Sequence, residues 1–346
     1  MIGSETVLAS RELNRAVLAR QLLLERRRLS LPKALERIGG IQAQYAPSMY
    51  VGLWSRLEGL ERATLTRALE RRSVVQGTLM RMTIHLVSRR DYWPFAVAVR
   101  ETRRASWLRT ARDAPDAAAM AATAEALRER LGERTLHRKD LEALVGPRLA
   151  IGVGLWVDLV RAPPSGTWER RRADSYALAT TWLGEPDIDE GAAVEHLVRR
   201  YLAGFGPAAP GDIASFTGLP IGTLRPVLDG LPLRRFRSED GDELIDLPRA
   251  PLPHPGTPAP PRFLPTWDAT LLVHARRTGV LPEDLRPRVF SIRNPHSVST
   301  FLVDGEVAGA WRFEGDRVTL DPWRPLAPAD ERALRAEAER LAAFHA

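Results

Sequence analysis

Cysteine is absent from this chain of 346 residues, and only Lys33 and Lys139 of its 50 basic residues are lysines. Without thiols, the chain can form no disulfide, no thiolate nucleophile and no cysteine-ligated zinc or iron–sulfur site. The seven histidines are scattered and show no spacing typical of metal ligands. We therefore expect neither a metal nor a cofactor.

Long hydrophobic runs are missing too. No stretch reaches ~18 consecutive apolar residues, and the N-terminus lacks an apolar run behind a basic region. These absences predict a cytoplasmic protein that contacts no membrane.

Basic charge is abundant. The net charge is +7 and the sequence pI is about 10.4, and almost all of the basic residues are arginine. The planar arginine fork suits bidentate contacts to phosphates and bases, so the bias favours a nucleic-acid partner. A GC-rich genome also encodes proteins that are rich in arginine, so this alternative explanation of the arginine content stays open.

Hydrophobic periodicity predicts helices first. Apolar residues recur at helical spacing over 11–38, in one or two helices that the pair Gly39-Gly40 ends. An apolar segment at 50–57 and a short helix at 64–70 follow. Residues 74–87 are rich in β-branched side chains and predict two short strands. Three helices followed by a β-hairpin is the order of a winged helix.

The same order recurs twice. A helix at 117–131 precedes a second at 135–145, with Thr135 as its expected cap, and an apolar segment at 151–160. In the third unit, the helices expected over 195–203, 209–217 and 221–228 have helix-turn-helix spacing.

The C-terminal part combines several signals. Residues 248–265 are rich in proline and predict an extended linker. Asp304-Gly305 lies between apolar runs and predicts a hairpin over 300–313, and 328–344 predicts a closing amphipathic helix.

These patterns predict a mainly α fold with small β-wings, of the α+β class. We expect tandem winged-helix units at 8–110, 111–190 and 191–346. Together they would form a concave DNA-binding surface on a monomer.

The segment Gly39-Gly40-Ile41-Gln42-Ala43-Gln44 is the most informative motif. In an extended backbone, residues two apart project from the same face, which predicts that Gln42 and Gln44 form a paired amide site. Two amides could hold one water or one base edge in place. The alternative is a solvated strand end or a pair of satisfied backbone contacts.

Several motifs occur in a fixed order along nearly the whole chain, from about residue 8 to residue 325. They are Gly40-Ile-Gln-Ala-Gln44, Arg81-Met-Thr-Ile-His-Leu86, Pro164-Ser-Gly-Thr-Trp168, Tyr201-Leu-Ala-Gly-Phe-Gly-Pro207 and Phe263-Leu-Pro-Thr-Trp-Asp268 with Leu271, Leu272 and His274. Together they resemble the AlkZ/YcaQ family of bacterial DNA glycosylases, which are built from tandem winged helices.

The resemblance implies a function. It assigns Gln42 and Gln44 to the family's Gln-apolar-Gln catalytic motif. It also implies excision of N-alkylated purines from double-stranded DNA, including bulky adducts and crosslinks made by antibiotic genotoxins. One departure is Ala275-Arg276-Arg277, where the family pattern predicts an acidic residue among the arginines.

Amide chemistry leads to a related expectation. Hydrolysis of an N-glycosidic bond normally needs a carboxylate, and glutamine is neither a useful base nor an acid. An N7- or N3-alkylated purine carries a positive charge that already activates its departure, so positioning can suffice. We expect monofunctional hydrolysis of such cationic lesions, because no lysine adjoins the glutamines in sequence to form a Schiff base. The alternative is a non-catalytic winged-helix regulator or lesion-binding factor.

Further residues are candidates for contact with DNA or the lesion. Arg170, Arg171 and Arg172 adjoin a Pro-Ser-Gly turn and suit phosphate contact. Arg81, Thr83 and His85 could border the glutamine pocket, although a lone histidine in a strand is more often a structural hydrogen-bonding residue.

The remaining candidates each have a structural alternative. Trp54 and Trp168 could wedge against a base, but single tryptophans in apolar stretches are more often core residues. The Asp304-Gly305 hairpin could enter a groove, as a lesion-probing hairpin does in the family, or simply close the third unit. If a neutral base were excised, Asp268 would be the first candidate for the missing acid.

Overall fold

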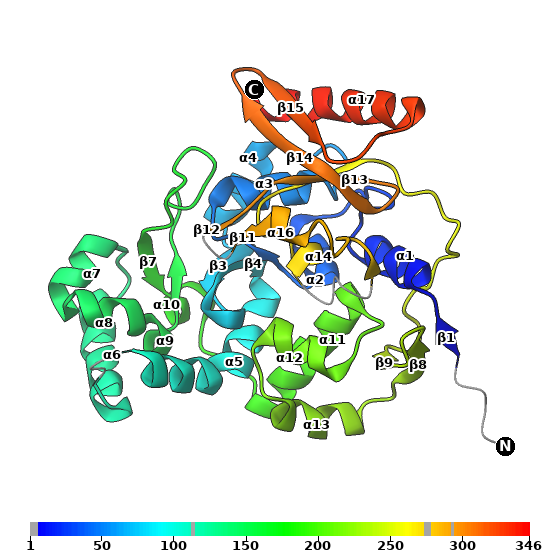
Figure 1. Ribbon diagram of the computed structural model, residues 1–346. Coiled ribbons are helices and arrows are strands. Elements are labelled where there is room, and N and C mark those ends of the chain that lie inside the picture. Colours follow the sequence, from blue (N-terminus) through cyan, green and yellow to red (C-terminus); the bar gives the residue numbers. More distant parts are fainter. Residues whose placement is uncertain (1–5, 112–114, 273–277, 292–293) are drawn as a thin grey trace.

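Small sheets set among helices make up the computed structural model, which describes residues 6–111, 115–272, 278–291 and 294–346. Figure 1 shows three groups of helices, with a long hairpin and a closing helix above them. The predicted mainly helical α+β fold is confirmed. Within the described residues, no helix is long and apolar enough to cross a lipid bilayer.

The first unit has the order helix, short strand, two helices and hairpin. Its elements are α2 (Leu31–Ile38), β2 (Ile41–Gln42), α3 (Ala46–Trp54), α4 (Arg62–Glu70), β3 (Val74–Thr78) and β4 (Ile84–Ser88). The buried face of α2 is the predicted stripe of Leu31, Ala34, Leu35 and Ile38. Gly39 ends this helix with φ 78°, a left-handed conformation that favours glycine.

The second unit follows the long helix α5 (Arg89–Thr110) and has a similar order, with three short helices in place of two before its hairpin. Its elements are α6 (Ala117–Leu131), β5 (Leu136–His137), α7 (Arg138–Val145), α8 (Pro147–Gly152), α9 (Gly154–Val157), β6 (Leu159–Arg161), β7 (Ser175–Leu178) and α10 (Ala179–Leu183). The prediction that Thr135 caps α7 is wrong. The short strand β5 intervenes, and His137 accepts a hydrogen bond from the Lys139 N–H instead.

One sheet joins the first two units. Its strand order is β2-β4-β3-β6-β7-β5, and Gly77 of β3 pairs with Val160 of β6. The second unit also has a core of its own, in which Trp107 and Trp156 meet edge to face with ring centroids 5.7 Å apart. The two units therefore share backbone hydrogen bonds while keeping partly separate cores.

The third unit contains the expected helix-turn-helix. Its elements are α11 (Glu190–Phe205), α12 (Pro210–Thr217), α13 (Ile221–Gly230), β8 (Arg234–Ser238) and β9 (Glu243–Asp246). The β8–β9 hairpin supplies a wing that the sequence analysis missed. The first strand of the chain, β1 (Val7–Leu8), pairs in parallel with β8, and α1 (Ser10–Arg20) follows it. Strand β1 thus contacts the third unit rather than the first.

The C-terminal part forms a second, four-stranded sheet with the order β10-β13-β14-β15. The elements of this part are β10 (Arg262–Leu264), α14 (Ala269–Leu272), α16 (Arg286–Val289), β11 (Phe290–Ser291), β12 (Asn294–Ser297), β13 (Thr300–Val303), β14 (Glu306–Glu314), β15 (Arg317–Pro322) and α17 (Pro328–His345). The predicted hairpin around Asp304-Gly305 and the closing helix are confirmed. His274 and residues 275–277 of the sequence motif lie outside the described residues.

Candidate functional site

The edge strand β2 carries Gln42 directly after the Gly39-Gly40 turn. Ile41 pairs with Leu86 and Gln42 pairs with His85 of β4. Gly40 has φ 80°, and a Cβ there would lie 3.2 Å from the Leu86 carbonyl oxygen. The turn therefore needs glycine, and it delivers the first glutamine to the sheet.

Gln42 lines a cavity of about 190 Å³ together with Arg81, Thr83, Ser215 and Trp267. The Gln42 side chain is only 7% exposed, and its amide makes no hydrogen bond to any of the described residues. Because the unbonded amide atoms are not fully enclosed by protein, a water or a ligand in the cavity can reach them.

Gln44 lies differently. It is exposed, it lines a separate cavity of about 510 Å³, and its Oε1 accepts a hydrogen bond from the Ile84 N–H at 3.2 Å. The expectation that both glutamines project from one face is wrong. Backbone bonding to β4 continues to the Ala43 N–H, which donates to the Ile84 carbonyl oxygen at 2.7 Å, and the chain then bends at Gln44 before α3.

The turn between β3 and β4 separates the two cavities. Arg81 and Thr83 line the Gln42 cavity, whereas Met82 and Ile84 line the Gln44 cavity. Alternate residues of one short segment therefore face opposite sides. The two glutamines bracket this turn.

No carboxylate lines either cavity among the described residues. Neither lysine of the chain lines them. Within the same described ranges, no cluster of three histidine, aspartate or glutamate side chains could hold a metal ion. The groups around the glutamines are amide, hydroxyl, arginine and apolar.

His85 lies under Gln42 and is 2% exposed. Its Nδ1 lies 3.1 Å from the Thr83 carbonyl oxygen, which can only accept, so Nδ1 carries the proton. Burial, with a smaller contribution from the Arg81 charge, lowers the pKa of His85 to about 3. His85 is therefore neutral near pH 7, and its contacts are those of the structural alternative.

Arg81 connects the turn to the third unit. Its guanidinium donates to the Phe216 carbonyl oxygen and lies 5.1 Å from the centre of the Phe216 ring. Burial lowers the pKa of Arg81, with partial compensation from Tyr201. The backbone at Arg81 has φ 52°, which is uncommon for a residue with a side chain. This contact holds α12 against the Gln42 cavity.

Arg170, Arg171 and Arg172 lie on the loop between β6 and β7, and all three are exposed. Among the described residues, none of them forms an ion pair with a carboxylate. The Arg171 guanidinium donates to the Tyr45 hydroxyl at 3.1 Å, one residue after Gln44. The predicted basic loop thus lies next to the glutamine segment, with its arginines exposed.

Both tryptophans belong to the core. Trp168 is 6% exposed and packs edge to face on Tyr50 and His345, with ring centroids 5.6 and 5.0 Å away. Trp54 is buried under the Arg26 guanidinium, 4.3 Å from its ring centre. Contact of Trp168 with DNA is not what the structure shows, because the C-terminal helix α17 covers it.

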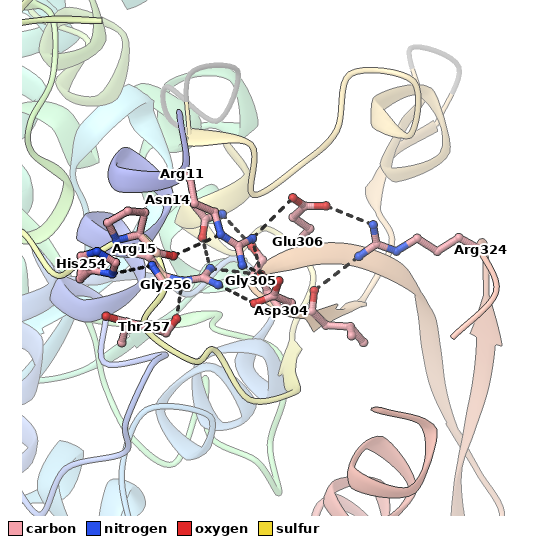
Figure 2. A network of polar contacts seen from close by, with 12 residues as sticks. Arg11, Asn14, Arg15, His254, Gly256, Thr257, Asp304, Gly305, Glu306 and Arg324 are labelled. Atoms are coloured by element: carbon pink, nitrogen blue, oxygen red, sulfur yellow. Dashed lines mark hydrogen bonds and ion pairs between the residues drawn. The ribbon is translucent and has the colours of Figure 1, made fainter. Parts of the chain in front are cut away.

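The Asp304-Gly305 turn is also occupied by protein. Figure 2 shows Asp304 between Arg11 and Arg15 of α1, with both ion pairs at 2.5 Å, while Asn14 donates to the Gly305 carbonyl at 3.0 Å. Desolvation acts to raise the pKa of Asp304, but the bonds and charges of the two arginines hold it below its ordinary value. The turn therefore packs on α1, as the alternative of a closing hairpin predicts.

Asp268 is part of a buried ion pair. Each of its oxygens accepts a 2.9 Å hydrogen bond from Arg56, and the Thr270 hydroxyl donates at 2.7 Å. Although burial acts to raise the pKa of Asp268, these partners lower it. The carboxylate is ionised and fully engaged, so it is no general acid for a departing base.

Sequence reasoning missed two kinds of residue at this site. Ser215 of α12 and Trp267 line the Gln42 cavity, and the Trp267 N–H donates to the Ser297 hydroxyl at 2.7 Å. Tyr45 and Met82 are large apolar residues left 45% and 40% exposed beside the glutamines. Trp267 belongs to the sequence motif over residues 263–268 and could have been found there, whereas no local sequence pattern marks Ser215.

Comparisons with known proteins agree with this architecture. A family model described as "DNA glycosylase AlkZ-like" matches residues 35–344. The Streptomyces sahachiroi DNA glycosylase AlkZ has the same fold, with a TM-score of 0.80 over 98% of each chain at 18% sequence identity. No curated protein sequence matches the chain.

The family match and the fold together define a DNA glycosylase, an enzyme that acts on DNA. More specifically, the chain belongs to the AlkZ-like DNA glycosylase family.

We predict that replacing Arg170, Arg171 and Arg172 together with glutamine weakens binding to duplexes of any sequence. Each lost phosphate contact should make the slope of log K against log salt shallower by about 0.9. Titrations at several salt concentrations measure this. A triple glutamine variant of the exposed Arg332, Arg335 and Arg340 on α17 removes equal charge and is the control. Equal slopes in the two variants would place the basic loop away from DNA.

The buried neutral His85 predicts a pH effect on stability. Between pH ~3 and ~6.5 the unfolded chain binds more protons at this site than the folded protein, so the free energy of unfolding falls as pH is lowered through that window. The loss approaches about 1.4 kcal/mol per pH unit. Urea unfolding at pH 7 and pH 5 should therefore show a weaker pH dependence for His85→Gln than for wild type. The control is His254→Gln on the proline-rich segment; parallel changes in all three proteins would contradict the assignment.

Proposed function

We propose that this glycosylase hydrolyses the N-glycosidic bond of purines alkylated at N7 of guanine or N3 of adenine. Gln42 and Gln44 serve as its catalytic residues. The observation that carries the proposal is the chemistry of the two cavities: each contains a glutamine, and no carboxylate lines either one among the described residues. Such a site cannot protonate a leaving base, so it needs a base that is already activated.

The reaction follows from that constraint. When the bond between C1′ and the alkylated purine breaks, its electron pair moves to the purine and neutralises the cationic ring. Water then attacks the sugar cation and loses its proton to solvent, which leaves an abasic site. The unpaired Gln42 amide supports this route, because its oxygen can accept a hydrogen bond from the attacking water and place partial negative charge near C1′.

Gln44 would act from the other side of the turn. Its oxygen is held by the Ile84 N–H, which fixes the plane of the amide and leaves its amino group free to donate. Two amides held at fixed positions suit a mechanism that works mostly by orientation, an effect that can contribute several kcal/mol.

Cavity size bears on how the lesion is recognised. The Gln42 cavity of about 190 Å³ is smaller than the ~300–1,000 Å³ typical of small-molecule pockets. So small a cavity favours recognition of the lesion without deep extrusion of the base. An enzyme that does not enclose the base can accept purines with large alkyl groups. We therefore extend the proposed substrates to bulky, antibiotic-derived and crosslinked purines, with a role in repair and genotoxin self-resistance by a cytoplasmic monomer.

The first prediction concerns the two glutamines. Gln42→Ala and Gln44→Ala should each lower the single-turnover rate of base release by about 10²-fold, because misplacing a reacting group costs that much. Affinity for the same duplex should stay within a few fold of wild type. Release from N7-methylguanine DNA and equilibrium binding are measured on the same preparations. Near-normal release by both variants would remove the glutamines from the mechanism, and parallel loss of binding would make their role structural.

The second prediction concerns the leaving group. Duplexes with N7-methylguanine or N3-methyladenine should release base, whereas matched duplexes with uracil or hypoxanthine should not, because nothing at the site can protonate a neutral base. High-performance liquid chromatography of the released bases measures the reaction on all four duplexes. Rapid release of uracil would show that an acid has been overlooked.

A further inference from the structure

The larger of the two cavities beside the glutamines, the one that Gln44 lines, lies where the first two units meet. Gln44, Thr78, Met82 and Ile84 form its wall on the first unit. The opposite wall consists of Trp107 on α5 and of second-unit residues on α7, α8, α9, β6, β7 and the loop between these two strands. At about 510 Å³, it is within the usual range for a pocket that binds a small molecule.

The floor and the mouth of this cavity differ in character. Trp107, Leu155 and Leu159 line it and are each less than 10% exposed, so the floor is apolar. Gln44 and Met82 also line it and are exposed. The cavity therefore opens to solvent at the glutamine segment and becomes apolar away from it.

One cation is directed into this apolar space. Arg161 lines the cavity, its Nη1 donates to the Thr78 hydroxyl at 2.8 Å, and its guanidinium lies 5.1 Å from the Tyr176 ring centre. Its Nη2 forms no hydrogen bond with the described residues and, unlike the enclosed Nε, is not fully buried, and no carboxylate pairs with the guanidinium among those residues. Arg138 lines the cavity as well, but it is paired with Glu142 at 2.7 Å. Arg161 thus has bonding capacity that the protein does not use.

We propose that this cavity is a subsite for the substituent of a bulky N-alkyl adduct. The proposal rests on the function proposed above: the purine lies at the glutamines and its alkyl group enters the cavity past Gln44. The lining selects a flat, apolar substituent that carries a carboxylate or carbonyl oxygen, with Arg161 as the partner of that oxygen. A DNA phosphate could also meet Arg161, but the apolar floor favours the substituent because phosphate is strongly hydrated.

The test fills the cavity and compares a small with a large adduct. Ala150, on α8, lines the cavity and is half-buried, so Ala150→Phe should occupy part of it. Gly154→Leu is a second filling variant, because a Cβ at Gly154 has its nearest neighbour at 3.6 Å, an ordinary contact. Ala122→Phe, on the exposed face of α6 in the same unit, is the control.

Single-turnover release is measured from duplexes that carry N7-methylguanine, N7-benzylguanine or N7-(4-carboxybenzyl)guanine. We expect both filling variants to lower release of the two benzyl adducts about tenfold or more and to leave N7-methylguanine within twofold of wild type. The control should match wild type on all three. Equal losses on all adducts, or no loss on any, would overturn the subsite.

A second arm tests the cation. Arg161→Gln should lower release of the carboxybenzyl adduct more than that of the benzyl adduct, whereas Arg138→Gln should affect the two equally. A uniform loss on all three adducts with Arg161→Gln would assign Arg161 to a DNA phosphate and overturn its proposed role.

Wild-type behaviour separates this inference from the function on which it rests. Release of N7-methylguanine without release of either benzyl adduct would overturn the subsite and leave the glycosylase assignment intact. Release of none of the three would overturn both.

Discussion

The site depends on two residue pairs between β2 and β4. Ile41–Leu86 and Gln42–His85 are the residue pairs of this ladder, and together with the Ala43 N–H, which donates to the Ile84 carbonyl oxygen at 2.7 Å, they attach the glutamine segment to the sheet shared by the first two units. The chain then bends at Gln44 before α3, and Gln44 lines the cavity beside the second unit instead of the Gln42 cavity.

Among the described residues, the carboxylates near this short strand are bound to arginines and do not line the glutamine cavities. Asp268 is bound to Arg56, Asp304 to Arg11 and Arg15, and Asp246 to Arg20 at 2.8 Å. Such pairs fasten distant segments together, and removing one partner of a buried pair typically costs about 3–5 kcal/mol. The polar groups that line the two cavities are amides, hydroxyls and arginines. The chemistry proposed for the enzyme follows from the absence of a carboxylate among the described residues that line these cavities.

Local patterns in the sequence predicted much of the fold. The stripe of α2, the Gly39 stop, the β3–β4 hairpin and helix α6 all follow from periodicity and turn chemistry, which act over a few residues. The outcomes that local patterns did not decide share a cause. Thr135 does not cap α7 because β5, which follows it, pairs with β7, and the Asp304-Gly305 turn packs on α1. In both cases the partner is distant in sequence. The separation of Gln42 from Gln44 escaped prediction for the same reason, since pairing with β4 decides where β2 ends.

The most direct test of the account is a crystal structure of the protein bound to duplex DNA that contains a cationic azasugar analogue of the sugar intermediate. The account predicts an ordered water held by the Gln42 amide, within about 3.2 Å of both the amide and the analogue, with no carboxylate in contact with the ring. A carboxylate bound to that water, or a Gln42 amide turned away from the sugar, would contradict it.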